Sequence, residues 1–172
     1  YFFDFAVLVG EAAEGSRVGD ELPRATMLVG VGPEQETFCR EVKQKGAKAG
    51  LAAFLTLIAQ KHQTGEKGHV VVRGDNEASL MQTLRHGVTE ANRRGEISCQ
   101  IDPEKSESPW QNRAEARVIF MKEQVGVLLH GAKLRLGKPV PLQCGVVRHI
   151  EPHAEWVQNH LAKKLQGPGG VR

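Results

Sequence analysis

A short apolar segment between two stretches of helical periodicity constrains the fold of this chain more than any other feature. His69–Arg73 (HVVVR) contains three consecutive valines, which are typical of a strand buried on both faces. Apolar residues recur at helical spacing before it, in Lys48–His62, and after it, in Asn76–Arg94. A strand between two helices joins a sheet through a parallel crossover. The sequence therefore predicts an α/β fold.

The other segments complete a mixed five-stranded sheet flanked by helices. Three strands at the start of the chain follow one another without a helix and predict an antiparallel meander, after which the strands are parallel. The predicted strands are Tyr1–Val9, Ala25–Val31, Thr37–Lys43, His69–Arg73 and Glu96–Ile101, and the predicted helices are Lys48–His62, Asn76–Arg94, Gln111–Leu136 and one around His153–Leu165. We expect residues 1–136 to form the main domain and residues 137–172 a helical C-terminal extension.

Composition is that of a globular domain. The chain has 172 residues, of which 40% are hydrophobic and 25% charged. It lacks the run of roughly 18 apolar residues that crosses a bilayer, and its first residues lack the order of a signal peptide. Because it starts at Tyr1 inside a predicted strand, we expect it to be a fragment of a longer protein. We expect no membrane partner.

The cysteines and the charge distribution indicate the cellular compartment and the kind of binding partner. Cys39, Cys99 and Cys144 are odd in number and contain no Cys-x-x-Cys pair, so they predict a reducing, intracellular compartment and no zinc knuckle. Residues 1–110 carry 13 Lys and Arg against 16 Asp and Glu, whereas residues 111–172 carry 10 against 4. The basic C-terminal part suits a polyanion such as nucleic acid, and a plain solvated surface is the alternative.

Two aspartates stand out on the predicted strands. Asp4 interrupts the apolar run Tyr1–Val9 (YFFDFAVLV), and Asp75 follows His69–Arg73 after one glycine. A buried carboxylate without a partner is costly, which favours a site role for Asp4. Asp75 has two interpretations, as the N-cap of the following helix or as part of a carboxylate cluster that holds metal.

Two short motifs and the order of the elements resemble a known family. Arg73–Glu77 (RGDNE), ahead of a helix, and Gln111–Ala116 (QNRAEA), opening a later one, are similar to the second and third acidic motifs of the DDE integrase catalytic core of retroviruses and LTR retrotransposons, with copia-like elements the nearest likeness. The resemblance spans about residues 1–130 and implies the ribonuclease H-like fold. In that fold the first strand and the parallel strand lie side by side, which would make Asp4 and Asp75 neighbours. Glu115 would be the third acid.

The resemblance implies a polynucleotidyl transferase and endonuclease with Asp4, Asp75 and Glu115 as catalytic and metal-binding residues. Carboxylates suit two Mg²⁺ or Mn²⁺ ions, which activate an attacking oxygen and stabilise the leaving one. The attacking group would be water during trimming of the element's DNA ends and a DNA 3′-hydroxyl during strand transfer. The implied partners are double-stranded DNA, both element ends and target, and further copies of the chain. The implied location is the nucleus or a virus-like particle.

Residues near the third acid are candidate DNA contacts. Gln111, Glu115 and Lys122 share one face of the predicted helix. Lys122 and Arg117 would contact phosphates, and Gln111 resembles the Gln or Asn of the family motif.

The chain departs from the family pattern at Asn112, Ala78 and Ala116, where Gly, Pro and a basic residue are usual. Two alternatives therefore stand beside the integrase, namely a catalytically decayed nucleic-acid-binding module and a ribonuclease H-like nuclease.

A separate pair, His149 and His153, has helical spacing. For this pair we prefer a solvated helix face over a metal-binding role.

Overall fold

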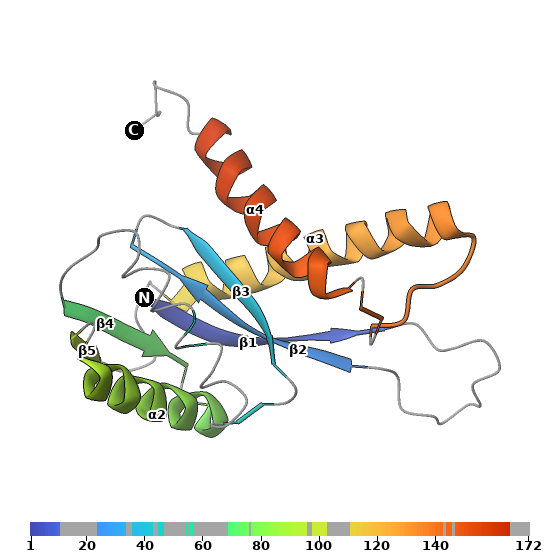
Figure 1. Cartoon of the computed structure of the whole chain (residues 1–172). Coiled ribbons are helices and arrows are strands. Elements are labelled where there is room, and N and C mark those ends of the chain that lie inside the picture. The colour runs from blue at the N-terminus through green and yellow to red at the C-terminus, as the bar shows by residue number, and fades with distance from the viewer. Residues whose placement is uncertain are drawn as a thin grey trace.

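The fold is seen in a computed structural model of the chain (Figure 1). It describes residues 1–10, 24–33, 36–42, 45–46, 54, 56, 69–75, 77–95, 98–102, 111–142, 144–145 and 147–165, and of residues 111–114, 148, 151 and 161–165 it describes the backbone alone. The predicted helix Lys48–His62, apart from Phe54 and Thr56, and the polar stretch 103–108 lie outside the described residues.

A mixed five-stranded sheet forms the centre of the molecule. Its strands are β1 (Phe2–Val9), β2 (Arg24–Val31), β3 (Thr37–Val42), β4 (His69–Gly74) and β5 (Ser98–Ile101), all close to their predicted bounds. β1 pairs with β2 and β2 with β3 in antiparallel fashion, whereas β1 with β4 and β4 with β5 are parallel pairs. The α/β class and the mixed, open sheet are therefore confirmed.

The order of the strands in space differs from the succession predicted along the chain. The spatial order is β3-β2-β1-β4-β5, so the third strand lies at one edge and the first strand lies in the middle. An antiparallel meander can extend in only one direction from β1. The crossover that follows β3 therefore returns β4 to the other side of β1, where its edge is available.

Helices cover the two faces of the sheet differently (Figure 1). α2 (Ala78–Arg94) lies on one face, which we name the α2 face. α3 (Gln111–Leu136) and α4 (Val147–Leu165) lie on the opposite, α3–α4 face, where α3 packs on β1 and β2 and α4 packs on β3. Of the described helices, none is both long and apolar enough to cross a membrane.

The sheet separates two apolar cores, one on each face, because successive side chains of a strand point to opposite sides. Phe3 and Phe5 of β1 lie in the core on the α2 face, and Ala6 and Leu8 lie in the core on the α3–α4 face. The first core also contains Leu28, Phe38, Val42, Phe54, Val70, Val72, Leu80, Leu84, Ala91 and Cys99; the second also contains Ala25, Met27, Val29, Cys39, Val118, Met121, Val125, Leu142, Ile150 and Ala154.

The last helix starts earlier than the sequence predicts. α3 has its predicted bounds, but α4 begins at Val147 and includes Pro152, which we expected to precede the helix. Proline removes a backbone hydrogen bond and disfavours a helix interior. Ile150 and Ala154 are buried on either side of it, so tertiary packing outweighs the local preference.

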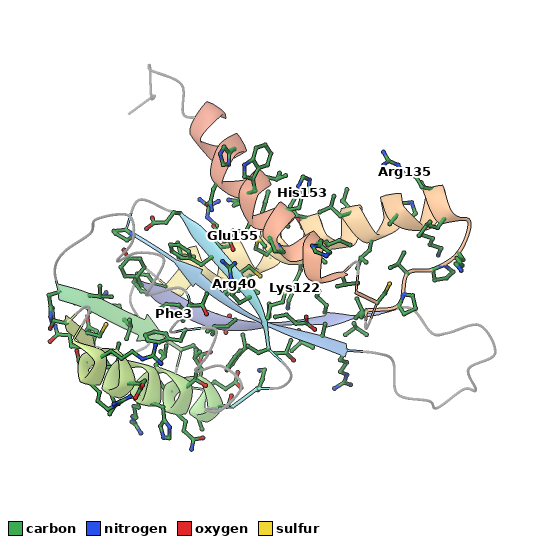
Figure 2. All side chains as sticks on the ribbon, viewed as in Figure 1. Phe3, Arg40, Lys122, Arg135, His153 and Glu155 are labelled. Atoms are coloured by element: carbon green, nitrogen blue, oxygen red, sulfur yellow. The ribbon has the colours of Figure 1, made fainter. Side chains whose placement is uncertain are left out.

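α4 also binds the exposed edge of the sheet through side chains (Figure 2). The amide of Asn159 accepts a hydrogen bond from the Thr37 backbone N–H at 2.7 Å and donates one to the Thr37 carbonyl at 2.8 Å. Glu155 accepts from the Cys39 backbone N–H at 2.8 Å and from the Arg40 guanidinium at 2.6 Å. These contacts replace a neighbouring strand along β3 and so protect this edge from pairing with another chain.

Removing the Asn159 amide should weaken this attachment. We expect Asn159→Ala to lower the free energy of unfolding by about 1–3 kcal/mol, because the backbone groups of the buried Thr37 lose their partners. Urea denaturation measures the change. His149→Ala, an exposed position on the same helix, is the control and should change stability little. Equal stability of the two variants would contradict the role assigned to Asn159.

Two glycines in helices should respond oppositely to alanine. A Cβ atom at Gly87 of α2 would overlap the ring of the fully buried Phe54, whereas a Cβ at Gly126 of α3 would meet nothing within 4 Å. We expect Gly87→Ala to destabilise the protein by about 1–3 kcal/mol through overpacking and Gly126→Ala to stabilise it by about 0.5–1 kcal/mol. Thermal and urea unfolding of both variants test this. A more stable Gly87→Ala protein would show that α2 packs differently.

Candidate active site

The two central parallel strands bring Asp4 and Asp75 to one place. Phe2 pairs with Arg73 and Phe3 with Gly74, so the next step of this register leads to Asp4 on β1 and Asp75 beyond the end of β4. Adjacent strands lie about 5 Å apart. Two acids that are remote in the sequence therefore become neighbours through the pairing of β1 with β4.

Asp4 lies on the α3–α4 face. Its antiparallel partner is Val29, which belongs to the core on that face, and its chain neighbours Phe3 and Phe5 belong to the other core. The strand pairing with β4 stops at Phe3. At this point the Phe5 backbone N–H donates to Asp4 Oδ1 at 2.6 Å, so the carboxylate replaces a strand partner.

The surroundings of Asp4 disfavour its charge. Partial burial raises the pKa of the Asp4 carboxyl, and the negative charges of Asp75 and Glu77 raise it further. The Phe5 N–H and the positive charge of Lys45 act in the opposite direction but do not overcome the burial. Asp4 is thus a half-buried acid beside other acids, an arrangement that a bound cation would relieve.

Close packing of α2 requires a glycine at the position before Asp75. A Cβ atom at Gly74 would approach Leu84 Cδ1 to 2.8 Å and Leu80 Cδ2 to 2.9 Å, so glycine allows α2 to pack tightly against the end of the strand. The chain then turns at Asp75, whose side chain accepts a hydrogen bond from the Glu77 backbone N–H.

The N-cap interpretation of Asp75 is wrong in detail. α2 begins at Ala78 with Glu77 in the N-cap position, and no side-chain capping bond is made there. The Glu77 carboxylate instead pairs with Lys45 Nζ at 2.7 Å and accepts from Ser79, and both contacts lower the pKa of Glu77. Asp75 organises the turn before the helix, and its side chain is exposed.

Glu115 is placed on the first turns of α3 and its side chain is exposed. It does not join the aspartates in a tight cluster, since no three Asp, Glu, His or Cys side chains within the described ranges come close enough to hold a metal ion. Glu77, rather than Glu115, is the third acid that raises the pKa of Asp4. The structure therefore brings together two of the three predicted acids.

The candidate DNA contacts lie on different flanks of α3. Lys122 is exposed and lies two turns beyond Glu115, on the same flank of the helix. Arg117 is half-buried on the other flank, and burial lowers the pKa of its guanidinium. Gln111 is the first residue of α3, and the structure describes its backbone but not its side chain. Of the two candidates whose side chains are described, Lys122 shares a surface with Glu115 and Arg117 does not.

The histidine pair lies on α4, which packs on β3 and α3. His149 and His153 are both exposed, as a solvated helix face requires. The ring of His153 stacks on Trp156 at 6.1 Å between centroids, and Trp156 stacks on His160 at 4.3 Å.

Sequence reasoning did not identify Lys45. It lies three residues after the end of β3, far from either aspartate in the chain, and no sequence pattern marks it. Its ammonium group pairs with Glu77, lies 5.8 Å from the centroid of the Phe5 ring, and acts on Asp4 electrostatically. Only the folded sheet brings these groups together.

The donor chemistry of this site fits a hard divalent cation. Asp4 on β1 and Asp75 directly after β4 supply carboxylate oxygens. A bound cation would offset the repulsion among these two acids and Glu77. Comparison with protein-family models gives no match, and comparison with curated proteins reveals no significantly similar sequence.

Replacing Asp4 by Asn should stabilise the cation-free protein at neutral pH. Because the pKa of Asp4 is raised on folding, its protonated form contributes stability below the unfolded value of roughly 3.9, and this contribution is lost as pH rises through the folded pKa. We expect Asp4→Asn to have the higher free energy of unfolding at pH 7 and to match the wild type near pH 3.5.

Urea denaturation across this pH range, in the presence of a chelator, measures the difference. Asn keeps an oxygen that can accept from the Phe5 N–H, so this bond is preserved. Lys122→Gln, which changes an exposed charge on the same face, is the control. An Asp4→Asn variant less stable than the wild type at pH 7 would show that the surroundings stabilise the charged form of Asp4 rather than disfavour it.

Proposed function

We propose that this chain is the catalytic core of a DNA integrase with a ribonuclease H-like fold, which cuts and joins DNA strands by metal-dependent phosphoryl transfer for a retrotransposon. The observation that carries the proposal is that β1, which holds Asp4, pairs in parallel with β4, which ends directly before Asp75. The motifs Arg73–Glu77 and Gln111–Ala116 support it, because they provide acids in the order that this chemistry uses.

Asp4 and Asp75 would hold the cations, with Glu115 as the third ligand from α3. Two Mg²⁺ or Mn²⁺ ions, when bound, supply activation of the attacking oxygen and stabilisation of the leaving one. The sheet holds the two aspartates in place, and burial of Asp4 strengthens its interaction with positive charge. The protein thus contributes positioning and electrostatic stabilisation and needs no covalent intermediate of its own.

DNA would lie across the surface that carries Glu115 and Lys122. Lys122 is an exposed ammonium group on the flank of α3 that also presents Glu115, so it suits a phosphate next to the acids. Gln111 and Arg117 are the further candidate contacts. Water would attack during end processing and a DNA 3′-hydroxyl during strand transfer, with two DNA ends and a target held by an oligomer of the chain.

A second function has one observation in its favour. Among the described side chains the three acids do not form one metal-binding group. A catalytically decayed module that keeps its affinity for nucleic acid through its basic C-terminal part would have this property. Such a module would bind DNA with a strong salt dependence and would not respond to divalent cations.

The test combines cation binding with DNA cleavage. We expect the protein to bind Mn²⁺ in calorimetry and to nick supercoiled plasmid or cut oligonucleotide duplexes in the presence of Mn²⁺ or Mg²⁺. Asp4→Asn, Asp75→Asn and Glu115→Gln should each reduce cleavage by more than about a hundredfold, since supporting groups around metal ligands alone account for 10- to 100-fold. Glu123→Gln, an exposed glutamate on the same helix, is the matched control and should retain full activity.

Two results would overturn the integrase. Mn²⁺ binding no stronger than that of Asp75→Asn, together with intact DNA binding, would establish the decayed module. Cleavage of RNA in RNA–DNA hybrids, with duplex DNA left intact, would establish a ribonuclease H-like nuclease instead.

A further inference from the structure

A cavity of about 450 Å³ opens over β1, β4 and β5 on the α3–α4 face. Its walls include Phe2, Val31, Val71, Arg73, Gln100 and Asp102, and we name it the β4–β5 cavity. It lies where the sheet extends past the helices of this face, since α3 packs on β1 and β2 and α4 on β3, whereas α2 packs on β4 and β5 from the other side. The volume is within the usual range for small-ligand sites.

The position of this cavity relates it directly to the candidate active site. Phe2 and Arg73 are paired across the two central strands, and each stands two residues before an aspartate, Phe2 before Asp4 and Arg73 before Asp75. On β1, side chains two residues apart point to the same face and are separated by about 7 Å, so Phe2 and Asp4 share a face. Asp75 follows the end of β4, and its charge acts on Asp4. The cavity and the acid pair are therefore adjacent on one surface.

The charges of the cavity disfavour a phosphate as its ligand. The Arg73 guanidinium forms an ion pair with the Asp102 carboxylate, so the side-chain charges in the lining balance. Both side chains of this pair are largely withdrawn from solvent, with 29% and 13% of their surfaces exposed. A neutral group suits this environment better than an anion, because an anion would have to compete with Asp102 for Arg73.

The remaining walls suit a flat heterocycle. The Arg73 guanidinium lies 5.5 Å from the centroid of the Phe2 ring. This contact and the ion pair with Asp102 together orient the plane of the guanidinium. Unstacked nucleobases bind to proteins by stacking on aromatic rings and guanidinium planes, against apolar walls such as Val31 and Val71. Gln100 and Asp102 offer donors and acceptors for the edge of a base.

We propose that the β4–β5 cavity binds one unstacked nucleobase of the DNA strand whose backbone lies at Asp4 and Asp75. This inference rests on the proposed function, and it identifies how the strand would be held in register with the acids. The base would occupy the cavity, and the adjoining sugar and phosphate would extend along β1 and β4 toward the acids. A strand end or a distorted duplex fits this site better than a regular duplex, because its bases unstack at lower cost.

Binding of the four deoxynucleoside 5′-monophosphates, followed by NMR without divalent cations, tests the cavity. We expect at least one of them to bind the wild-type protein. Val71→Trp fills the cavity and should weaken this binding at least about fivefold, the lower end of the effect of losing a base stack. Val127→Trp, at an exposed position of α3, adds the same side chain elsewhere and should leave binding unchanged. Circular dichroism establishes that both variants are folded.

Gln100→Ala is a second variant for the case in which Val71→Trp does not fold. Gln100 is exposed on β5, so its truncation should preserve the fold. We expect it to reduce the preference among the four nucleotides at least about fivefold, as expected for loss of a base-edge contact. The inference would be overturned if Gln100→Ala and, where it folds, Val71→Trp had the same nucleotide binding and preference as the wild type. It would also be overturned if the wild type bound no nucleotide.

Asp75→Asn separates this inference from the proposed function. It should abolish cleavage and leave nucleotide binding intact, because Asp75 is not part of the cavity lining. A wild type that cleaves DNA but binds no nucleotide would refute the cavity alone. A wild type that fails to cleave DNA, yet loses nucleotide binding in Val71→Trp, would refute the integrase and leave the base site standing.

Discussion

The parallel pairing of β1 with β4 is the contact on which the other features of this molecule depend. It places Asp4 beside Asp75, and it aligns Phe2 with Arg73 in the wall of the β4–β5 cavity. The pairing ends at Phe3 and Gly74, and beyond it β1 has no strand partner on that side among the residues that the structure describes. Polar groups collect where a central strand loses its partner, because backbone groups at that point still require hydrogen bonds.

The acid at this point reduces the stability of the cation-free fold at neutral pH. Asp4 is half-buried beside Val29 of β2, where a charge is disfavoured, and the nearby acids add repulsion. A hydrophobic residue would suit the strand better. Such a conflict between local environment and side chain is typical of functional sites, where charge is held ready for a ligand. Lys45 moderates the conflict without removing it.

The two edges of the sheet have different surroundings. At β3, Glu155 and Asn159 of α4 bond to the strand backbone, so the C-terminal helix is an integral part of the fold although it follows the last strand by a long interval. Toward β5, the α3–α4 face carries the β4–β5 cavity. The helical layer on that face is thus displaced toward β3, which leaves room for a ligand on the side where the aspartates lie.

The sequence by itself determined the types of elements, most of their bounds and the polar positions of Asp4 and Asp75, because side-chain periodicity and the burial of apolar residues are local properties of the chain. It did not determine the spatial order of the strands, the start of α4 at Val147 ahead of Pro152, or the association of Lys45 and Glu77 with Asp4. The exposed position of Glu115, apart from the aspartates, was likewise not predictable from its motif. These features arise only when strands pair and helices pack, since energies between residues distant in sequence then outweigh local preferences.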